Sequence, residues 1–242
     1  MSGYIVSEKQ TFEIFLRTER VLVRNKYPVV SNFTKNEATS ILKELNLRHW
    51  KNEKIIEIGC GSGRLLKVFK NNNFDYCGFD NDKLFVDYCK ERGLNVFYGD
   101  ATKKLGAEHK NRYGAVVIAF NTLFNFNRNK RKEWIKNANY LLKKDGLLIF
   151  TVYANNKTAK KDMQQRVDFY RDVIKPEEIC TIHFSTKKSR IEVIYKNETV
   201  WFSEWKKKNE IIKEIKGWKG FKFKSVKLID GGIAYLVRLS KL

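Results

Sequence analysis

The sequence predicts an α/β protein in which helices cover both faces of a mostly parallel sheet, an arrangement called doubly wound. Two observations predict this class. From Lys54 onward, short apolar runs alternate with amphipathic segments, as expected where helices connect parallel strands. The run Ala115–Phe120 is apolar throughout, which is typical of a strand buried on both faces. A chain of 242 residues is long enough for one such core with an insertion.

The alternation is clearest between residues 54 and 152. Each expected strand is a short run rich in apolar, β-branched or aromatic residues. Gly93 is a typical helix stop, and Trp134, Ile135, Ala138 and Leu141 recur at the spacing of a buried helical face. The expected strands are Lys54–Ile58, Phe74–Phe79, Leu94–Tyr98, Tyr113–Phe120 and Gly146–Val152, and the expected helices are Arg64–Lys70, Asp82–Arg92 and Lys130–Leu142.

After Tyr153 the pattern predicts an antiparallel excursion from the main sheet. One helix is expected within residues 155–173, and Ser203 is expected to cap a helix that reaches Lys216. The expected strands are Cys180–Phe184, Arg190–Tyr195, Thr199–Phe202, Phe221–Ile229 and Ile233–Leu239. The chain thus divides into a helical N-terminal lid (1–50), an α/β core (51–153), a small antiparallel and helical insertion (154–202), and a helix with a strand hairpin that completes the core (203–242).

The net charge of +21 is unevenly distributed. Residues 51–100 carry no net charge, whereas residues 101–150 carry +8 and residues 201–242 carry +7. Such an excess could attract RNA or another anion, although abundant exposed lysine is also ordinary. No secretion signal or membrane-length apolar run is visible, so we expect a cytoplasmic protein. The four cysteines form no C-x-x-C pair, and no metal site is expected.

A glycine-rich loop is the strongest local signal. The string Ile55-Ile56-Glu57-Ile58-Gly59-Cys60-Gly61-Ser62-Gly63-Arg64 joins an expected strand to an expected helix. Glycines at such a junction allow a sharp turn and let a ligand approach the backbone. A dinucleotide loop needs a small residue where Arg64 stands, so the string disfavours NAD.

With its acid before three alternating glycines, this string resembles the first motif of class I S-adenosylmethionine-dependent methyltransferases. Further landmarks follow in the family's order: Asp80 ends the second expected strand, Gly99-Asp100-Ala101 follows the third, and Phe120-Asn121 ends the fourth. The resemblance covers residues 50–153 well. It implies a seven-stranded Rossmann-like sheet with a final antiparallel strand, and S-adenosyl-L-methionine as the cofactor.

The resemblance also implies roles for particular residues. The acid after the second strand would bind the ribose hydroxyls, the residues after the third strand would contact adenine, and those after the fourth would meet the sulfonium and the methyl acceptor. The cofactor-binding residues expected on this basis are Glu57, Gly59, Cys60, Gly61, Gly63, Asp80, Asn81, Asp100, Ala101, Phe120 and Asn121.

The acceptor is approached through the stretch Asn121-Thr122-Leu123-Phe124-Asn125. It resembles the corresponding stretch of glycine N-methyltransferase and related small-amine enzymes, in which the asparagine helps to bind the acceptor. Asn121 is therefore expected to position the acceptor. It departs from the N-P-P-[YF] tetrad of enzymes that methylate amino groups of DNA bases, because Thr122-Leu123 replaces the prolines.

Three functions remain open at this point. The first is methyl transfer to a nitrogen or oxygen of a small molecule by in-line displacement. The second is methylation of RNA or tRNA through the basic C-terminal half. It rests on Lys103-Lys104, the run Arg128–Lys132, Lys206–Lys208 and the stretch Lys216–Lys227, which interleaves lysines with Trp218, Phe221 and Phe223. The third is a non-catalytic protein that binds the cofactor, which the intact glycine loop and both acids disfavour.

Overall fold

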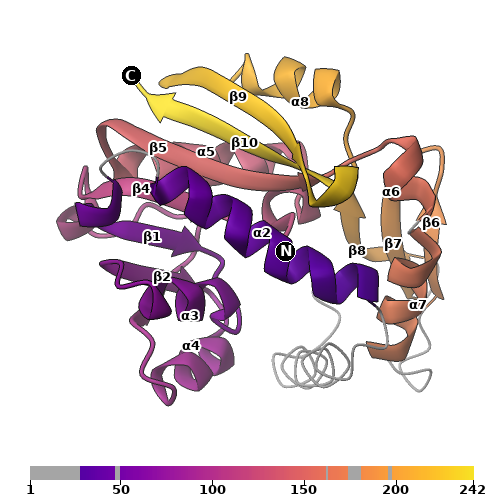
Figure 1. The fold of residues 1–242 in the computed structure, drawn as a ribbon, viewed down its shortest axis with the longest axis horizontal. Coiled ribbons are helices and arrows are strands. Elements are labelled where there is room, and N and C mark those ends of the chain that lie inside the picture. Colours follow the sequence, from indigo (N-terminus) through magenta and orange to yellow (C-terminus); the bar gives the residue numbers. More distant parts are fainter. Residues whose placement is uncertain (1–27, 47–49, 162, 174–180, 196–197) are drawn as a thin grey trace.

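The alternating apolar runs form a seven-stranded sheet in the computed structural model, which describes residues 28–46, 50–161, 163–173, 181–195 and 198–242. The strand order is β3-β2-β1-β4-β5-β10-β9 (Figure 1). Its strands are β1 (Ile55–Ile58), β2 (Tyr76–Asp80), β3 (Val96–Tyr98), β4 (Tyr113–Ile118), β5 (Leu142–Tyr153), β9 (Phe221–Ile229) and β10 (Ala234–Lys241). The helices that connect or flank these strands are α2 (Pro28–Asn46), α3 (Arg64–Asn71), α4 (Lys83–Lys90), α5 (Arg128–Leu141) and α8 (Lys208–Ile215).

Strand direction confirms the predicted fold class. Strands β3, β2, β1, β4 and β5 pair in parallel, whereas β10 runs antiparallel to both β5 and β9. The sheet is thus Rossmann-like with an antiparallel strand near its C-terminal end. Parallel strands end at a common edge, and here the carboxyl ends of β1, β2 and β4 come together.

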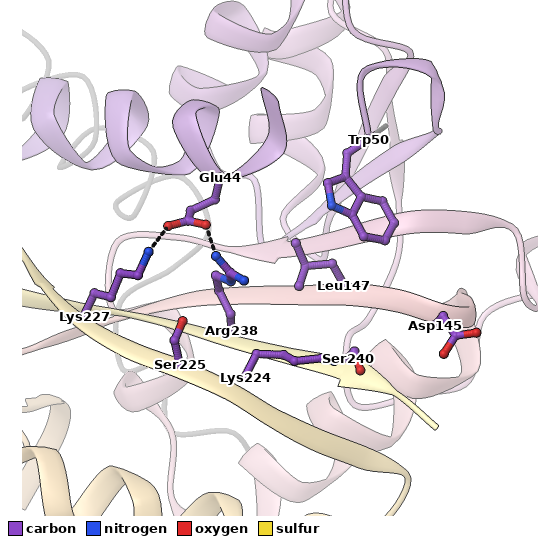
Figure 2. A pocket seen from close by; sticks show the side chains of 9 residues that line it. All are labelled: Glu44, Trp50, Asp145, Leu147, Lys224, Ser225, Lys227, Arg238 and Ser240. Carbon is purple, nitrogen blue, oxygen red and sulfur yellow. Dashed lines mark hydrogen bonds and ion pairs between the residues drawn. The ribbon is translucent and has the colours of Figure 1, made fainter. Parts of the chain in front are cut away.

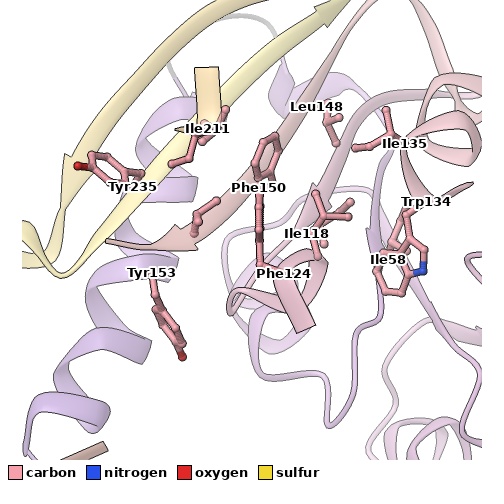
Figure 3. Packing of buried hydrophobic residues seen from close by; sticks show 14 of the residues in the cluster. Ile58, Ile118, Phe124, Trp134, Ile135, Leu148, Phe150, Tyr153, Ile211 and Tyr235 are labelled. Atoms are coloured by element: carbon pink, nitrogen blue, oxygen red, sulfur yellow. The ribbon is translucent and has the colours of Figure 1, made fainter. Parts of the chain in front are cut away.

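The alternation of side chains divides the core between the two faces of the sheet. Ile56, Val116, Leu148 and Phe150 pack with residues of α5 and α8 on one face (Figure 3). Their sequence neighbours in the same strands pack on the other face against α2, α3 and α4; they include Ile55, Ala115, Val117, Leu147 and Ile149. Because both faces are buried, the strands carry apolar residues at every position rather than at alternate ones.

A second, three-stranded antiparallel sheet forms the insertion, in the order β6-β7-β8. Its strands are β6 (Thr181–Ser185), β7 (Arg190–Tyr195) and β8 (Glu198–Glu204), preceded by α6 (Lys157–Lys161) and α7 (Met163–Val173) where one helix was predicted. The chain returns beside the end of β5, where the amide of Lys206 donates to the carbonyl of Tyr153 across 2.9 Å.

The predicted helix cap at Ser203 is wrong. Ser203 lies inside β8, and its hydroxyl accepts a hydrogen bond from Nδ2 of Asn121 at 2.8 Å. Helix α8 begins instead after Lys207, whose amide donates to the Glu210 carboxylate at 2.7 Å. The capping acid three residues into the helix therefore marks its start better than the upstream serine does.

The described residues also form short 3-10 helices: η1 (Trp50–Asn52), η2 (Ala107–His109), η3 (Thr122–Asn125) and η5 (Asp230–Gly232). In the part of the chain that the structure describes, no helix has both the length and the apolar character needed to cross a membrane. Residues 1–27, which hold the first half of the predicted lid, and Cys180 lie outside the described residues.

A buried ion-pair network joins α5, α8 and the insertion. Arg131 is 4% exposed; its Nε lies 2.8 Å from Glu214 of α8, and its guanidinium lies 3.1 Å from Glu204 at the end of β8. The same guanidinium donates to the carbonyl of Phe126. Removing the Arg131 cation would leave the buried Glu214 carboxylate without this ion pair, while Glu204 would keep its pair with Lys206 at 2.8 Å.

We expect Arg131→Ala to lower the free energy of unfolding by about 3 kcal/mol, because Glu204 and Glu214 would be left without their buried partner. The matched control is Lys136→Ala on the same helix, which breaks an exposed pair with Glu133 and should cost less than about 0.5 kcal/mol. Urea denaturation of both variants measures the difference. Equal losses in the two variants would contradict a central role for Arg131.

Candidate functional site

The loop after β1 is shaped by glycines in the left-handed region. Gly59, Gly61 and Gly63 have φ angles of 68°, 47° and 70°. A Cβ at Gly63 would lie 2.5 Å from the side chain of Leu94 and 2.9 Å from that of Cys89, so only glycine fits there. A Cβ at Gly61 would meet no atom within 4 Å. The loop is thus tightly packed at Gly63 and open at Gly61, and the open position leaves room for a ligand to approach the backbone.

A cavity of about 280 Å³ opens at the carboxyl ends of β1, β2 and β3. Of the predicted cofactor-binding residues, it brings together Gly59, Asp80, Asn81, Asp100 and Ala101. Residues that were not predicted for the site complete its lining: Phe79, Gly99, Thr102, Phe126, Lys130 and Trp134. Of the remaining predicted residues, Glu57 lies in β1, and Cys60, Gly61, Gly63, Phe120 and Asn121 lie in the adjoining loop and turn; none of these six is in the lining itself.

Asp80 connects the loop to the end of β2. Its Oδ2 accepts the amide of Gly61 at 2.8 Å, and its Oδ1 accepts the amide of Asp82 at 3.0 Å. Burial raises the pKa of this carboxyl group, while the two backbone hydrogen bonds oppose the rise. Each carboxylate oxygen can accept more than one hydrogen bond, so Asp80 keeps acceptor capacity toward the cavity.

Asp100 is partly engaged by its own turn. Its Oδ1 accepts both the amide and the hydroxyl of Thr102, at 2.8 and 2.7 Å. Burial tends to raise its pKa, but the hydrogen bonds from Thr102 and the charge of Lys103 outweigh burial and lower it. Asp100 is therefore both a turn cap and a charged group on the cavity wall.

Glu57 is buried beneath the glycine loop. Its Oε2 finds no hydrogen-bond partner among the described residues. Burial raises the pKa of Glu57 well above its usual value, and the nearby carboxyl groups of Glu37 and Asp80 raise it further, against an opposing effect of Arg64. A buried carboxyl group without a donor is suited to receive a cationic ligand group.

The end of β4 makes an unusual turn. Phe120 and Asn121 have φ angles of 55° and 58°, in the left-handed region that bulky residues such as Phe seldom occupy. The Arg64 guanidinium lies 4.2 Å from the centre of the Phe120 ring. The turn thus touches the start of α3, directly after the glycine loop.

The amide of Asn121 is buried and already bonded. Its Nδ2 donates to the Ser203 hydroxyl at 2.8 Å and to the Glu204 carbonyl at 3.1 Å, and its Oδ1 accepts the amide of Tyr153 at 2.9 Å. These bonds tie the end of β4 to β5 and to β8 of the insertion. A direct contact between Asn121 and an acceptor stays a prediction.

Among the residues missed by sequence reasoning, Trp134 lines the cavity, with its ring centre 4.9 Å from that of Phe126. Trp134 was expected only as a core residue, because its helical spacing reports burial and not which end of the face meets a cavity. Glu37 of α2 was also missed, since one acid on an N-terminal helix carries no local signal.

A larger cavity of about 580 Å³ lies elsewhere, on the sheet face next to α2 (Figure 2). It runs toward the amino end of β5, where Leu147 pairs with Ser240 of β10. Glu44 pairs there with Lys227 at 2.9 Å and with Arg238. Since the glycine loop and the acids lie at the opposite edge of the sheet, we place the candidate site in the smaller cavity.

Comparison with known proteins agrees with this geometry. A family model described as a methyltransferase domain matches residues 31–188. No curated protein matches the sequence. Solved structures under 25% identical show that the fold is shared. The glycopeptide N-methyltransferase MtfA, solved with S-adenosyl-L-homocysteine, is 13% identical, with 85% of this chain and 89% of that chain covered and a TM-score of 0.61.

Two further structures cover nearly the whole chain. A methyltransferase from Thermotoga maritima, described as a possible histamine N-methyltransferase, is 16% identical over 95% of this chain and 99% of that chain, with a TM-score of 0.60. A methyltransferase from Clostridium acetobutylicum is 11% identical over 96% and 99%, also with a TM-score of 0.60. The family match spans well over half of the sequence, so the chain belongs to the methyltransferase-domain family and is a class I S-adenosylmethionine-dependent methyltransferase.

Proposed function

We propose that the protein transfers a methyl group to a nitrogen or oxygen of a small molecule that binds beside the Phe120–Asn121 turn. The observation that carries the proposal is the attachment of β8 to this turn through Ser203 and Glu204. The attachment brings the insertion to the carboxyl ends of β4 and β5, where it acts as a cap over the acceptor. A covered site suits a small acceptor and excludes water.

The fold neighbours support a small acceptor. One is named as a glycopeptide N-methyltransferase and another as a possible histamine N-methyltransferase. Both names specify nitrogen as the methylated atom. For this chain the atom and the molecule are proposals, because a shared fold does not fix the acceptor.

The cavity residues fit the cofactor. When bound, S-adenosylmethionine supplies a methyl group on an electrophilic sulfonium. Asp80 would accept the ribose hydroxyls, and Asp100 with Ala101 would meet the adenine edge beside Phe126 and Trp134. The unpartnered oxygen of Glu57 would accept the methionyl ammonium group. The open space above Gly61 leaves room for the ligand to approach the loop.

The chain's own contribution to transfer is orientation. In-line displacement requires the acceptor to be held close to the methyl carbon and aligned with the bond that breaks. The Phe120–Asn121 turn is rigid because Asn121 is bonded to three backbone or side-chain partners. A neutral amine needs little more than such positioning, whereas a hydroxyl acceptor also needs a base.

RNA is the alternative acceptor. The edge strand β9 exposes Lys222, Phe223 and Lys224, a combination that can track phosphates and stack bases. Leu239, the register partner of Phe223 on β10, also pairs with Leu148 in the amino half of β5. This basic run therefore lies toward the sheet edge opposite the cofactor cavity and would not lead RNA to it, whereas Lys130, in the run Arg128–Lys132, lines the cavity.

We expect S-adenosylhomocysteine, and not NADH, to raise the melting temperature of the protein, since a ligand that binds only the folded state stabilises it.

Asp80→Asn should weaken S-adenosylhomocysteine binding by about tenfold or more, through loss of a charged acceptor for hydroxyl groups. Asp75→Asn is the control, because Asp75 is exposed at the start of β2. Calorimetric titration measures both affinities, and equal weakening would remove Asp80 from the site.

We expect Glu57→Gln to stabilise the ligand-free protein increasingly as the pH rises. In the folded state the pKa of Glu57 is raised, so its favourable contribution is present below the ordinary pKa and is lost as the pH passes the raised one. Gln cannot ionise and avoids that loss. The melting temperature of the variant minus that of the wild type should therefore grow as the pH rises above the ordinary carboxyl range, from about pH 5 upward.

The same variant should bind S-adenosylhomocysteine more weakly, whereas Glu133→Gln on the exposed side of α5 should not. Thermal melts across the pH series and calorimetry give the two readouts. A pH-independent difference in melting temperature together with unchanged affinity would contradict both the buried charge and its assignment to the cofactor.

The acceptor class is tested by transfer of labelled methyl groups to fractionated cell extract, with and without ribonuclease. We expect label in the low-molecular-weight fraction, with incorporation unaffected by ribonuclease. Label lost after ribonuclease treatment would contradict the small-molecule acceptor and show that RNA is methylated. Binding to RNA that falls steeply with salt would accompany that result.

A further inference from the structure

The left-handed turn at the end of β4 has an internal support that comes from α2. Two consecutive residues other than glycine, Phe120 and Asn121, adopt positive φ angles there. Each such residue costs about 1–2 kcal/mol relative to the right-handed region. Such strain persists only where neighbouring groups fix the conformation.

The support is the carboxyl group of Glu37. Its Oε1 accepts the backbone amide of Phe120 at 2.8 Å. The same oxygen accepts the hydroxyl of Thr151 in β5, and that hydroxyl oxygen in turn accepts the amide of Asn121 at 3.4 Å. One carboxyl oxygen thereby holds both amides of the turn, one directly and one through Thr151.

Burial makes this arrangement consequential. Glu37, Thr151 and Asn121 are all fully inaccessible to solvent. Burying a carboxyl group is costly unless donors compensate it, and unpaired backbone amides in the same place would be costly too. The hydrogen bonds between the carboxyl group, the hydroxyl and the two amides relieve both costs at once. Losing the carboxyl oxygen would leave the Phe120 amide without this acceptor, and losing the hydroxyl would do the same to the Asn121 amide.

The turn contacts both the start of α3 and the insertion. The Phe120 ring lies under the Arg64 guanidinium at the start of α3, beside the glycine loop. Asn121 holds Ser203 and Glu204 of the insertion. A shift of the turn would therefore move both the cofactor side and the acceptor side of the site.

We propose that Glu37 is a positioning residue for methyl transfer, which sets the shape of the Phe120–Asn121 turn from α2. The helix α2 crosses one face of the large sheet and reaches α7 of the insertion (Figure 1). This segment, part of the predicted lid, thus belongs to the transfer site through one buried side chain. The inference rests on the proposed function for its catalytic consequence, while its structural part stands on the hydrogen bonds alone.

The test measures amide hydrogen exchange of the ligand-free protein by NMR. In Glu37→Ala the amide of Phe120 should exchange about tenfold faster or more, while the amides of β4 at Val117 and Ile118 keep their protection. Glu37→Gln retains a carbonyl oxygen and should preserve the protection. Thr151→Val keeps the shape of the side chain but removes the hydroxyl, so only the Asn121 amide should exchange faster.

The catalytic part uses labelled-methyl transfer into the acceptor fraction of the extract. Glu37→Ala should lower the maximal rate by about ten- to a hundredfold, with the Kd for S-adenosylhomocysteine changed less than about threefold. Glu37→Gln should restore most of the rate. The matched control is Glu44→Gln on the same helix, which loses charge at the ion pairs with Lys227 and Arg238 and should affect stability alone.

The outcomes separate the two proposals. If wild-type protein transfers no methyl group, the proposed function fails, and amide exchange still judges the shape of the turn. Unchanged exchange at Phe120 in Glu37→Ala overturns the inference. Faster exchange with an unchanged transfer rate overturns the positioning role, as does an equal loss of rate in Glu44→Gln. Should Glu37→Ala fail to fold, Thr151→Val tests the second half of the same support, and unchanged exchange of the Asn121 amide in that variant would overturn the inference.

Discussion

The buried parallel strands end together at one edge of the large sheet, and this determines where the turns and the candidate site lie. Strands β1 and β4 are buried on both faces. The turn that follows each strand therefore begins inside the protein, where its backbone amides and carbonyls need hydrogen-bond partners other than water. The chain meets this constraint with left-handed residues after both strands, glycines after β1 and Phe120-Asn121 after β4. These adjacent turns leave backbone amides at the carboxyl edge, and the buried side chains that accept from those amides form the site.

Asp80 and Asp100 each combine a structural role with a predicted chemical one. Asp80 accepts the amide of Gly61 and lines the smaller cavity, and Asp100 accepts the amide of Thr102 in its own turn and lines the same cavity. Asn121 bonds to three partners, which fixes the end of β4 against the insertion. These side chains therefore have defined hydrogen-bond partners within the protein itself. It also means that a substitution at these positions is informative only beside a control that changes stability without touching the turn.

The parts of the site that were predictable from the sequence are local in the chain. The glycines act within five residues, and Asp80, Asn81, Asp100 and Ala101 each follow a strand that its own composition marks. The contributions that escaped prediction act across long separations. Glu37 meets Thr151 114 residues further along the chain, and Asn121 meets Ser203 82 residues away. Ser203 was read as a helix cap because its local context fits one, and only the partner strand decides otherwise. Periodicity gave the buried face of α5 correctly but not the exposure of Trp134 to the cavity.

The distribution of charge follows the same division between local and distant effects. The surface excess of lysine gives the chain its net charge of +21, yet the groups buried around the cofactor loop are acidic: Glu37, Glu57 and Asp80, opposed by Arg64. Charge buried at low dielectric acts more strongly than charge on a solvated surface, because surface charge is screened by water and salt. Burial raises the pKa of Glu57 and of Asp80, and a cation bound beside these carboxyl groups would favour their charged forms, whatever the sign of the exterior.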